Sequence, residues 1–254
     1  MEKNPLHIQY IALKDGSIKR DLKDYPFNIP LIGKFKEFTF SKPVTFFIGE
    51  NGTGKSTLLE AIAVSCGFNA EGGSKNFNFN TKETHSDFYK YLRIGKSYNA
   101  IHDGYFLRAE SLYNLASNID ELASDGYSSL YDSYGGKSLH EQSHGESFLA
   151  LLKNRLGGNG LYLFDEPEAA LSPMKLLELL VIIDDLVQNN SQFIICTHSP
   201  ILMAYPNAEI YEIHDGELVL TAFEDTNHYS LTKYFLSNYK QMIKKLGIEE
   251  KELP

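Results

Sequence analysis

The sequence lacks any apolar run of the roughly 20 residues that a bilayer-spanning helix needs. Its first thirty residues also lack the basic start and the apolar stretch of a signal peptide. We therefore expect a cytoplasmic protein that makes no direct membrane insertion.

Cysteine is scarce, with two in 254 residues. Cys66 and Cys196 are far apart, each stands beside apolar residues, and neither belongs to a CxxC pair. This spacing indicates neither a zinc site nor a disulfide framework. We expect two reduced thiols in the core.

Positive charge is in short supply, because 24 Lys and Arg residues stand against 33 Asp and Glu residues, a formal net charge of −9. Such a balance argues against a strongly electrostatic, non-specific nucleic-acid binder. A local basic face is compatible with an acidic total, so charge alone leaves nucleic acid open as a partner. Hydrophobic residues make up 43% and charged residues 22%, which excludes a disordered or fibrous chain.

Short apolar segments alternate with helical patterns along the chain. Val44–Ile48, Leu161–Phe164 and Gln192–Thr197 are typical of strands buried on both faces of a largely parallel sheet. Further expected elements are the strands His7–Leu13 and Phe35–Phe40, a hairpin of Glu209–His214 with Leu218–Ala222 around Asp215-Gly216, a helix capped by the Ser172 hydroxyl and running from Pro173 to Gln188, and a helix over Leu231–Leu246. The pattern predicts an α/β fold with a mixed sheet and flanking helices.

The segment from Gly49 to Ser56, GENGTGKS, fits the P-loop pattern in full and lies between an expected strand and an expected helix. The glycines let backbone N–H groups and the helix N-terminus face phosphates, Lys55 meets the β- and γ-phosphates, and Ser56 ligates magnesium. The alternative is a glycine-rich turn with an unrelated lysine. The expected nucleotide-binding residues are Gly49, Glu50, Asn51, Gly52, Thr53, Gly54, Lys55, Ser56 and Thr57.

An acidic pair, Asp165 and Glu166, ends the apolar strand at 161–164. Asp165 is the candidate metal residue together with Ser56, and Glu166 is placed to polarise an attacking water. Alone, such a pair could be a helix-starting turn. The P-loop upstream favours the catalytic interpretation.

The segment Gln142–Ser147, QSHGES, opens an expected helix and offers a hydroxyl and free backbone donors that suit a γ-phosphate. By itself it is a helix cap. His198 directly follows the strand expected at 192–197, where a lone histidine is usually structural.

Together these four motifs, in this order from Gly49 to His198, resemble the ABC ATPase superfamily. Ser143, Gly145 and Glu146 stand at the Ser, second Gly and Gln places of its LSGGQ signature, and His198 matches its switch histidine. The resemblance implies an ABC-type P-loop NTPase that hydrolyses ATP with Mg²⁺ through Glu166, His198 and Lys55. It also implies a head-to-tail homodimer, induced by ATP, in which each P-loop faces the other copy's signature.

We expect a single ABC-type domain over residues 1–254. Residues 1–66 and 157–225 would form the nucleotide-binding core, and 226–254 a C-terminal helix and tail. Residues 67–156 would form an inserted loop and helical subdomain, because composition shifts to Asn, Gly, Ser and aromatic residues until about Gly104 and helical spacing returns at Ser111–Leu122 and Ser147–Leu156.

The segment 165–173, DEPEAALSP, resembles soluble, SMC-like and related AAA-type ATPases, whereas transporter subunits more often have DEPTSALD. The glutamine that senses magnesium in transporters is missing, because no glutamine occurs between the P-loop and Gln142. The segment Tyr105–Ser111 is its candidate replacement, with Arg108 or Glu110 near the metal.

Other stretches resemble a family of stand-alone bacterial ATPases, namely 25–30, 72–77, 106–111 and 228–238. Only about ninety residues separate Lys55 from Ser143, too few for a long coiled-coil arm. We therefore expect a bare ATPase head.

Two departures from the superfamily pattern point to slow or partner-dependent turnover. His144 replaces the first signature glycine, and Ser172 stands where transporters place an aspartate. The candidates for stacking on adenine are Tyr25 and Phe27, although core packing explains Phe27 equally well.

Our leading hypothesis is an ATP-driven switch or motor for an unidentified protein partner or a nucleic-acid process, such as genome maintenance or phage defence. The alternatives are the cytosolic ATP-binding subunit of a membrane transporter and a regulatory module that holds ATP without turnover. Lys240, Lys244 and Lys245 suit either a basic patch or a solvated helix face, and acidic residues from Glu249 onward favour the solvated face.

Overall fold

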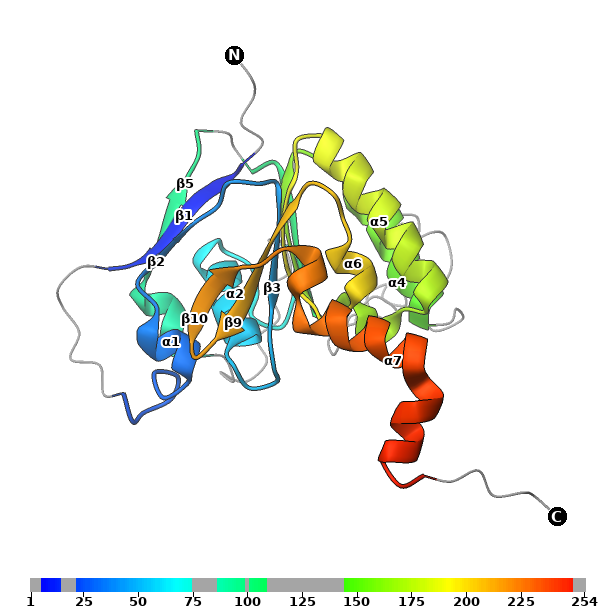
Figure 1. Cartoon of the computed structure of the whole chain (residues 1–254). Coiled ribbons are helices and arrows are strands. Elements are labelled where there is room, and N and C mark those ends of the chain that lie inside the picture. The colour runs from blue at the N-terminus through cyan, green and yellow to red at the C-terminus, as the bar shows by residue number, and fades with distance from the viewer. Residues whose placement is uncertain (1–5, 15–21, 75–85, 99–100, 109–143, 249–254) are drawn as a thin grey trace.

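The computed structural model describes residues 6–14, 22–74, 86–98, 101–108 and 144–248. Two sheets organise these residues, one of seven strands and one of three (Figure 1). The expected helix at 111–122 lies outside the described residues.

The seven-stranded sheet has the order β10-β9-β3-β8-β7-β6-β4. Its five central strands run parallel, and the edge strands β10 and β4 are antiparallel to their neighbours. The expected α/β fold with a mixed sheet is therefore confirmed. The strands are β3 (Val44–Ile48), β4 (Gly73–Ser74), β6 (Asp103–Arg108), β7 (Gly160–Asp165), β8 (Gln192–Cys196), β9 (Ala208–His214) and β10 (Glu217–Leu220).

Helices cover both faces of this sheet (Figure 1). On one face lie α1 (Pro30–Lys34) and α2 (Lys55–Ser65), and on the other lie α4 (His144–Arg155), α5 (Pro173–Gln188) and α6 (Pro200–Met203). Neighbouring residues of β3 alternate between the two cores, so that Phe46 packs on the α5 side and Phe47 on the α2 side. Every residue of β3 is buried, and four of the five are apolar, as expected of a strand that is covered by helices on both faces of the sheet.

One detail of the expected α5 helix is wrong. The helix begins at Pro173 and ends at Gln188, as expected, but the Ser172 side chain makes no capping hydrogen bond. Ser172 instead contributes its backbone carbonyl, which accepts from the Leu176 N–H at 3.0 Å. Because proline at the first position already fixes φ for a helix, this start does not need the hydroxyl.

A three-stranded antiparallel sheet, β2-β1-β5, packs beside α2 (Figure 1). Its strands are β1 (Ile8–Leu13), β2 (Glu37–Thr39) and β5 (Leu92–Lys96), and the 3₁₀ helix η1 (Asp87–Tyr91) leads into β5. Both η1 and β5 fall where composition indicated a loop and a small inserted layer. The strand β6 also lies within 67–156, yet it belongs to the main sheet, and the division of the chain into core and insertion stays a prediction.

Gln192 connects the two sheets. Its fully buried side chain accepts from the backbone N–H groups of His7 and Ile8, both at 2.8 Å, and donates to the Ile8 carbonyl at 3.0 Å. These bonds satisfy backbone groups at the start of β1 that would otherwise lose their hydrogen bonds on burial.

The hairpin between β9 and β10 turns at Asp215-Gly216, as predicted, with φ of 49° and 79°. This two-residue turn contacts α1, where the Lys34 ammonium donates to the Asp215 carbonyl at 2.6 Å. A Cβ at Gly216 would lie 2.6 Å from the Pro30 carbonyl group. The turn therefore needs glycine for its contact with α1 as well as for its φ.

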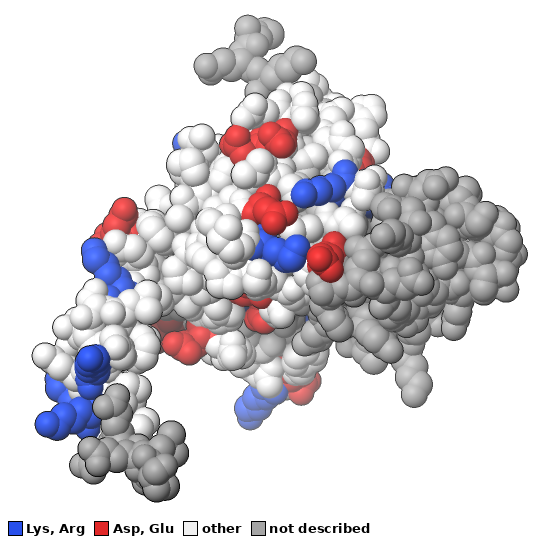
Figure 2. Space-filling model, turned by 90° about the vertical axis from the view of Figure 1, so that its right-hand side faces the viewer, with Lys and Arg blue, Asp and Glu red and all other residues white. Residues whose placement is uncertain are grey.

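The C-terminal helix α7 (Asn227–Lys245) begins earlier than expected and extends away from the body (Figure 1). It follows the 3₁₀ helix η6 (Phe223–Asp225), is interrupted at Asn238, and has no buried residue along its length, all of which is described. On the face shown in Figure 2 acidic and basic groups are interspersed over much of the surface. Lys240, Lys244 and Lys245 are exposed and belong to the last two turns of α7.

None of the described helices is both long enough and apolar enough to cross a membrane.

Replacing Gln192 by methionine tests the connection between the sheets. Gln192→Met removes three hydrogen bonds and leaves buried backbone groups unsatisfied, so we expect a loss of about 3 kcal/mol or more in the free energy of unfolding. The matched control is Gln188→Met on the exposed surface of α5, which should change stability by less than about 0.5 kcal/mol. Urea denaturation measures both, and equal effects would contradict this role of Gln192.

Candidate functional site

The expected site residues follow three neighbouring parallel strands. The P-loop follows β3. Asp165 is the last residue of β7, and Glu166 comes directly after it. His198 follows β8, which lies between β3 and β7 in the sheet. Because the carboxyl ends of these strands lie at one edge of the sheet, residues more than 140 positions apart come together there.

The P-loop takes a conformation that depends on its glycines. Gly49, Gly52 and Gly54 have φ of 143°, 78° and 106°. A Cβ at Gly54 would lie 2.8 Å from Ile29, and one at Gly49 would lie 3.2 Å from Ile213, whereas no atom lies within 4 Å at Gly52. Gly49 and Gly54 thus let the loop pack closely on the protein. Gly52 borders open space, where a phosphate can approach the backbone.

Lys55 is the first residue of α2 and is buried. Its ammonium folds back over the loop and donates to the carbonyls of Gly49 at 2.7 Å and Glu50 at 2.9 Å. Burial lowers the pKa of Lys55, while the negative charges of Glu166 and Asp165 counteract that effect. The ammonium therefore lies within the loop that would surround a bound phosphate.

Ser56 and Asp165 form the oxygen pair expected for a metal. The Ser56 hydroxyl donates to Asp165 Oδ1 at 2.9 Å, with Asp165 buried. Magnesium prefers oxygen ligands, and in nucleotide sites it takes only one or two from the protein and the rest from phosphates and water. No cluster of three or more His, Cys, Asp or Glu able to hold a metal occurs among the described residues, and a nucleotide-bound magnesium ion does not need one. The residues present fit Mg²⁺.

Arg108 lies next to this pair. Its Nε is 3.8 Å from Asp165 Oδ2, and its Nη1 is 3.0 Å from Glu60 on α2 and 3.2 Å from the Ala70 carbonyl. Arg108 is thus near the expected metal position, as the sequence suggested, while Glu110 lies outside the described residues. Which residue replaces the missing glutamine stays a prediction.

Glu166 and His198 face each other, with His198 Nε2 3.5 Å from Glu166 Oε1. Glu166 has φ of 50° and ψ of 53°, a left-handed conformation that costs a non-glycine residue free energy and that is common at functional sites. Its side chain is 43% exposed, so water can reach the carboxylate.

Glu168 holds the end of β8, a role that the sequence analysis missed. Its carboxylate accepts from the Thr197 hydroxyl at 2.8 Å and from the His198 backbone N–H. Glu168 belongs to the 3₁₀ helix η5 (Pro167–Ala170), which directly follows Glu166. Glu168 therefore links the segment that carries Glu166 to the segment that carries His198.

His228, at the start of α7, was also missed. Its Nε2 lies 3.0 Å from His198 Nδ1. Burial lowers the pKa of His228, and repulsion from His198 and Lys55 adds to that effect, whereas Glu212 and Glu50 oppose it. Thirty residues separate the two histidines, and no sequence pattern links them.

The signature segment is only partly described. Ser143 lies outside the described residues, and Gly145 and Glu146 occupy the first turn of α4. A Cβ at Gly145 would lie 2.9 Å from Lys175 and 3.2 Å from the Ala170 carbonyl, so this part of α4 is turned toward α5 and η5. Glu146 is exposed. Their expected role toward the P-loop of a second copy stays a prediction.

Phe27 is a core residue rather than an adenine platform. It is 7% exposed and makes edge contacts with Phe88 and Tyr91 at centroid distances of 6.1 and 5.0 Å. Tyr25 is 64% exposed and stays the candidate for stacking. Both cysteines are buried, as expected of core residues.

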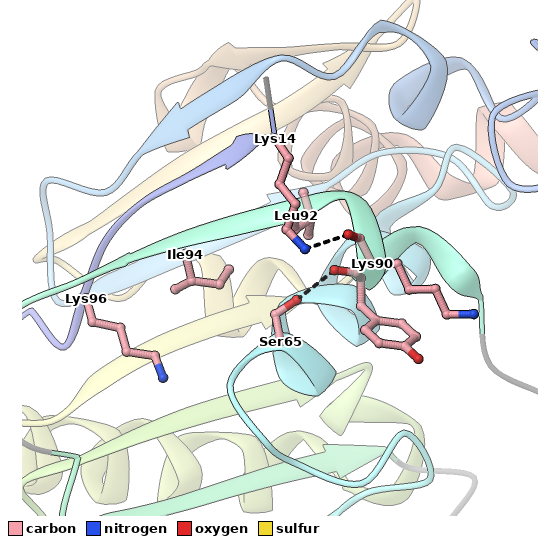
Figure 3. A pocket seen from close by; sticks show the side chains of 7 residues that line it. Lys14, Ser65, Lys90, Leu92, Ile94 and Lys96 are labelled. Atoms are coloured by element: carbon pink, nitrogen blue, oxygen red, sulfur yellow. Dashed lines mark hydrogen bonds between the residues drawn. The ribbon is translucent and has the colours of Figure 1, made fainter. Parts of the chain in front are cut away.

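A separate pocket of about 520 Å³ lies at the other end of α2, about 15 Å along the helix from Lys55 at 1.5 Å per residue (Figure 3). Lys14 donates there to the Lys90 carbonyl at 2.6 Å, and Lys90 pairs with Asp87 at 2.7 Å. The pocket lies at the C-terminal end of α2, where backbone carbonyls rather than N–H groups are left without helical partners, so it lacks the phosphate-binding features of the P-loop site. It is lined by Lys14, Ser65, Tyr89, Lys90, Leu92, Ile94 and Lys96.

Comparison with known families gives two partial matches. A model described as "AAA domain" matches residues 28–124. A second, described as "AAA domain, putative AbiEii toxin, Type IV TA system", matches residues 147–204. The two segments contain the P-loop, the acidic pair and His198.

Among curated proteins, the chain is similar to the macrolide export ATP-binding/permease protein MacB of Hahella chejuensis, with 25% identity over 195 residues. The match covers 68% of this chain and 28% of MacB, so the chain spans about a quarter of that relative's length.

Among solved structures, the SMC head domain from Thermotoga maritima is 16% identical at a TM-score of 0.44, over 85% of this chain and 98% of that one. An ATP-binding cassette of an ABC transporter is 18% identical at a TM-score of 0.47, over 97% and 100%. At this level of similarity neither structure assigns a function to the chain.

Replacing Lys55 tests whether the P-loop binds nucleotide. Lys55→Met removes the ammonium at the phosphate position, and with charge-assisted hydrogen bonds worth about 1.5–3 kcal/mol each we expect ATP affinity to fall at least about 100-fold. The control is Lys36→Met, which removes an exposed lysine outside the site and should leave affinity unchanged. Titration of a fluorescent ATP analogue with Mg²⁺ measures both, and equal affinity in the two variants would place the nucleotide elsewhere.

Proposed function

We propose that this chain, which is a P-loop NTPase of the ABC/AAA kind, hydrolyses ATP with Mg²⁺ at the edge of the sheet where β3, β7 and β8 end. The proposal rests on two pairs of side chains that meet at this edge, one suited to hold a metal and one suited to act on water. Ser56 and Asp165 are 2.9 Å apart, and Glu166, directly after Asp165, is 3.5 Å from His198.

Binding would depend mainly on the P-loop. The backbone N–H groups of Gly49 to Ser56 and the N-terminus of α2 would surround the phosphates, with Lys55 on the β- and γ-phosphates. Magnesium, when bound, neutralises the charge that develops on the phosphates. Ser56 and Asp165 would hold it, and Arg108 would orient the Asp165 carboxylate from its other side.

Hydrolysis would depend on Glu166 and His198. Glu166 would accept a hydrogen bond from the attacking water and orient it in line with the γ-phosphate. His198 would donate a hydrogen bond to a γ-phosphate oxygen and stabilise the charge that grows there. Glu168 would keep the histidine in place through its backbone and through Thr197.

The Glu166→Gln variant tests the assignment of the water-orienting residue. The amide keeps the shape but cannot act as a base, so we expect normal ATP affinity and a fall in kcat of at least about 100-fold. Glu217→Gln, on the exposed edge strand β10, should retain full turnover. Phosphate release measures both, and wild-type turnover in Glu166→Gln would mean that another group orients the water.

We further propose that two copies form a head-to-tail dimer around ATP, with Ser143, Gly145 and Glu146 of one copy facing the P-loop of the other. The exposure of the Glu166 side chain, 43%, supports a site that is completed from outside the chain. In this arrangement ATP joins the two copies and hydrolysis separates them.

Light scattering of Glu166→Gln tests the dimer. With Mg·ATP we expect a mass near twice 28.7 kDa, and without ATP a mass of 28.7 kDa. Adding Ser143→Arg should place a bulky cation at the interface and keep the protein monomeric while it still binds ATP. A dimer that forms equally well with Ser143→Arg would contradict the composite site.

The biological role we propose is a switch or motor for a protein partner, in genome maintenance or defence. The segment 165–173 and the missing glutamine support it, as does the toxin system named in the description of the second family model. Exposed apolar residues on α7 are suited to a protein partner, namely Leu231, Tyr234, Leu236 and Tyr239.

The match to MacB favours transport as a second candidate, since that protein is an export ATP-binding/permease protein. Affinity purification of tagged Glu166→Gln with Mg·ATP from its host separates the two roles. Recovery of an integral membrane protein would support transport and contradict the switch.

A further inference from the structure

The imidazole of His228 comes from α7, outside the segments that carry the four motifs. Its Nε2 is 3.0 Å from Nδ1 of His198, with ring centroids 5.2 Å apart and an interplanar angle of 55°. A distance of 3.0 Å between two nitrogens is a hydrogen bond, so one of them carries the shared proton.

The other nitrogen of His198, Nε2, faces the Glu166 carboxylate at 3.5 Å. It is a buried atom and has no hydrogen-bond partner in the part of the chain that the structure describes. Unless a proton occupies Nε2, a nitrogen lone pair would face a carboxylate. Two acceptors in that position repel each other.

Counting protons limits how His198 can be protonated. A neutral ring with its proton on Nδ1 would bond His228 but would turn a lone pair toward Glu166. When His228 Nε2–H donates to Nδ1, the proton of a neutral His198 lies on Nε2. A doubly protonated His198 likewise carries a proton on Nε2. The arrangements that suit Glu166 therefore all place a proton on Nε2.

We propose that His228 is a positioning residue, which bonds Nδ1 of His198 so that Nε2 carries a proton and can donate toward Glu166 and the γ-phosphate. The inference rests on the proposed function, because the donation matters only if His198 serves ATP hydrolysis. A partner that sets the tautomer of a functional histidine through its second nitrogen is a general device of histidine sites.

Hydrogen bonds hold the backbone segments that carry both rings. Thr226, fully buried before α7, accepts from the Tyr229 N–H at 3.2 Å and donates to the Phe223 carbonyl at 2.8 Å, which sets the first turn of the helix. The His198 backbone is held by Glu168. The lowered pKa of His228 favours its neutral form, which has a single ring proton, and with that proton on Nε2 the ring donates to Nδ1 of His198.

Substitutions at His228 test the proposal through ATP turnover. His228→Leu keeps the bulk but removes the donor, so we expect kcat to fall about 10- to 100-fold at unchanged ATP affinity. His228→Gln places an amide N–H near the position of Nε2 and should retain turnover to within about 3-fold of wild type. Thr232→Ala, one turn later on α7 and exposed, is the control for a general disturbance of the helix.

A double-mutant cycle separates positioning from structural support. Once His198→Gln has removed the ring, adding His228→Leu should change kcat by less than about 2-fold, because the second residue acts only through the first. Full additivity of the two substitutions, or wild-type turnover in His228→Leu, would overturn the proposal.

The tautomer itself provides a measurement that does not need turnover. Two-bond ¹H–¹⁵N spectra of histidine-labelled protein, with the His198 signals assigned by their loss in His198→Gln, should show Nε2–H in the wild type and a shift toward Nδ1–H in His228→Leu. An unchanged His198 tautomer in His228→Leu would overturn the proposal. Absence of ATP turnover in the wild type would contradict the proposed function, and the spectra would then decide the role of His228 alone.

Discussion

The parallel pairing of β8 between β3 and β7 is the constraint on which the site depends. Every residue of these three strands is buried, and their registers place Phe47 beside Cys196 and Cys196 beside Asp165. Because strand spacing is about 4.8 Å, the loops that follow the three strands are held within reach of one phosphate group. The rest of the molecule supports this arrangement, with helices on both faces and the small sheet attached through Gln192.

We assign three different roles to the carboxylates at this edge of the sheet, because their surroundings differ. Asp165 is buried beside Ser56, where an ion pair with a metal is favourable. Glu166 is in a left-handed conformation and open to water, which suits a residue that orients a reactant. Both carboxylate oxygens of Glu168 accept hydrogen bonds from residues that follow β8, Thr197 and His198, so its contribution is structural. A single short segment thus supplies a candidate metal ligand, a candidate base and a residue that holds the end of β8 in place.

The sequence predicted the parts of the fold and site that depend on local patterns. Continuous apolar runs placed β3, β7 and β8, the Asp215-Gly216 turn placed the last hairpin, and the P-loop pattern placed Lys55 and Ser56. Elements without a local signal were missed. The strand β5 has only five residues, of mixed character, and depends on pairing with β1 more than seventy residues away. The contacts of Glu168 and His228 were missed for the same reason, since they exist only once η5, β8 and α7 are packed together.

The most direct test of the account is a crystal structure of Glu166→Gln soaked or grown with ATP and Mn²⁺, whose anomalous signal locates the metal. We expect the triphosphate to be wrapped by residues 49–56, the metal to bind Ser56 and Asp165, and the γ-phosphate to lie between Lys55 and His198 Nε2. A nucleotide bound away from the P-loop, or a metal without Ser56 and Asp165 among its ligands, would contradict the account.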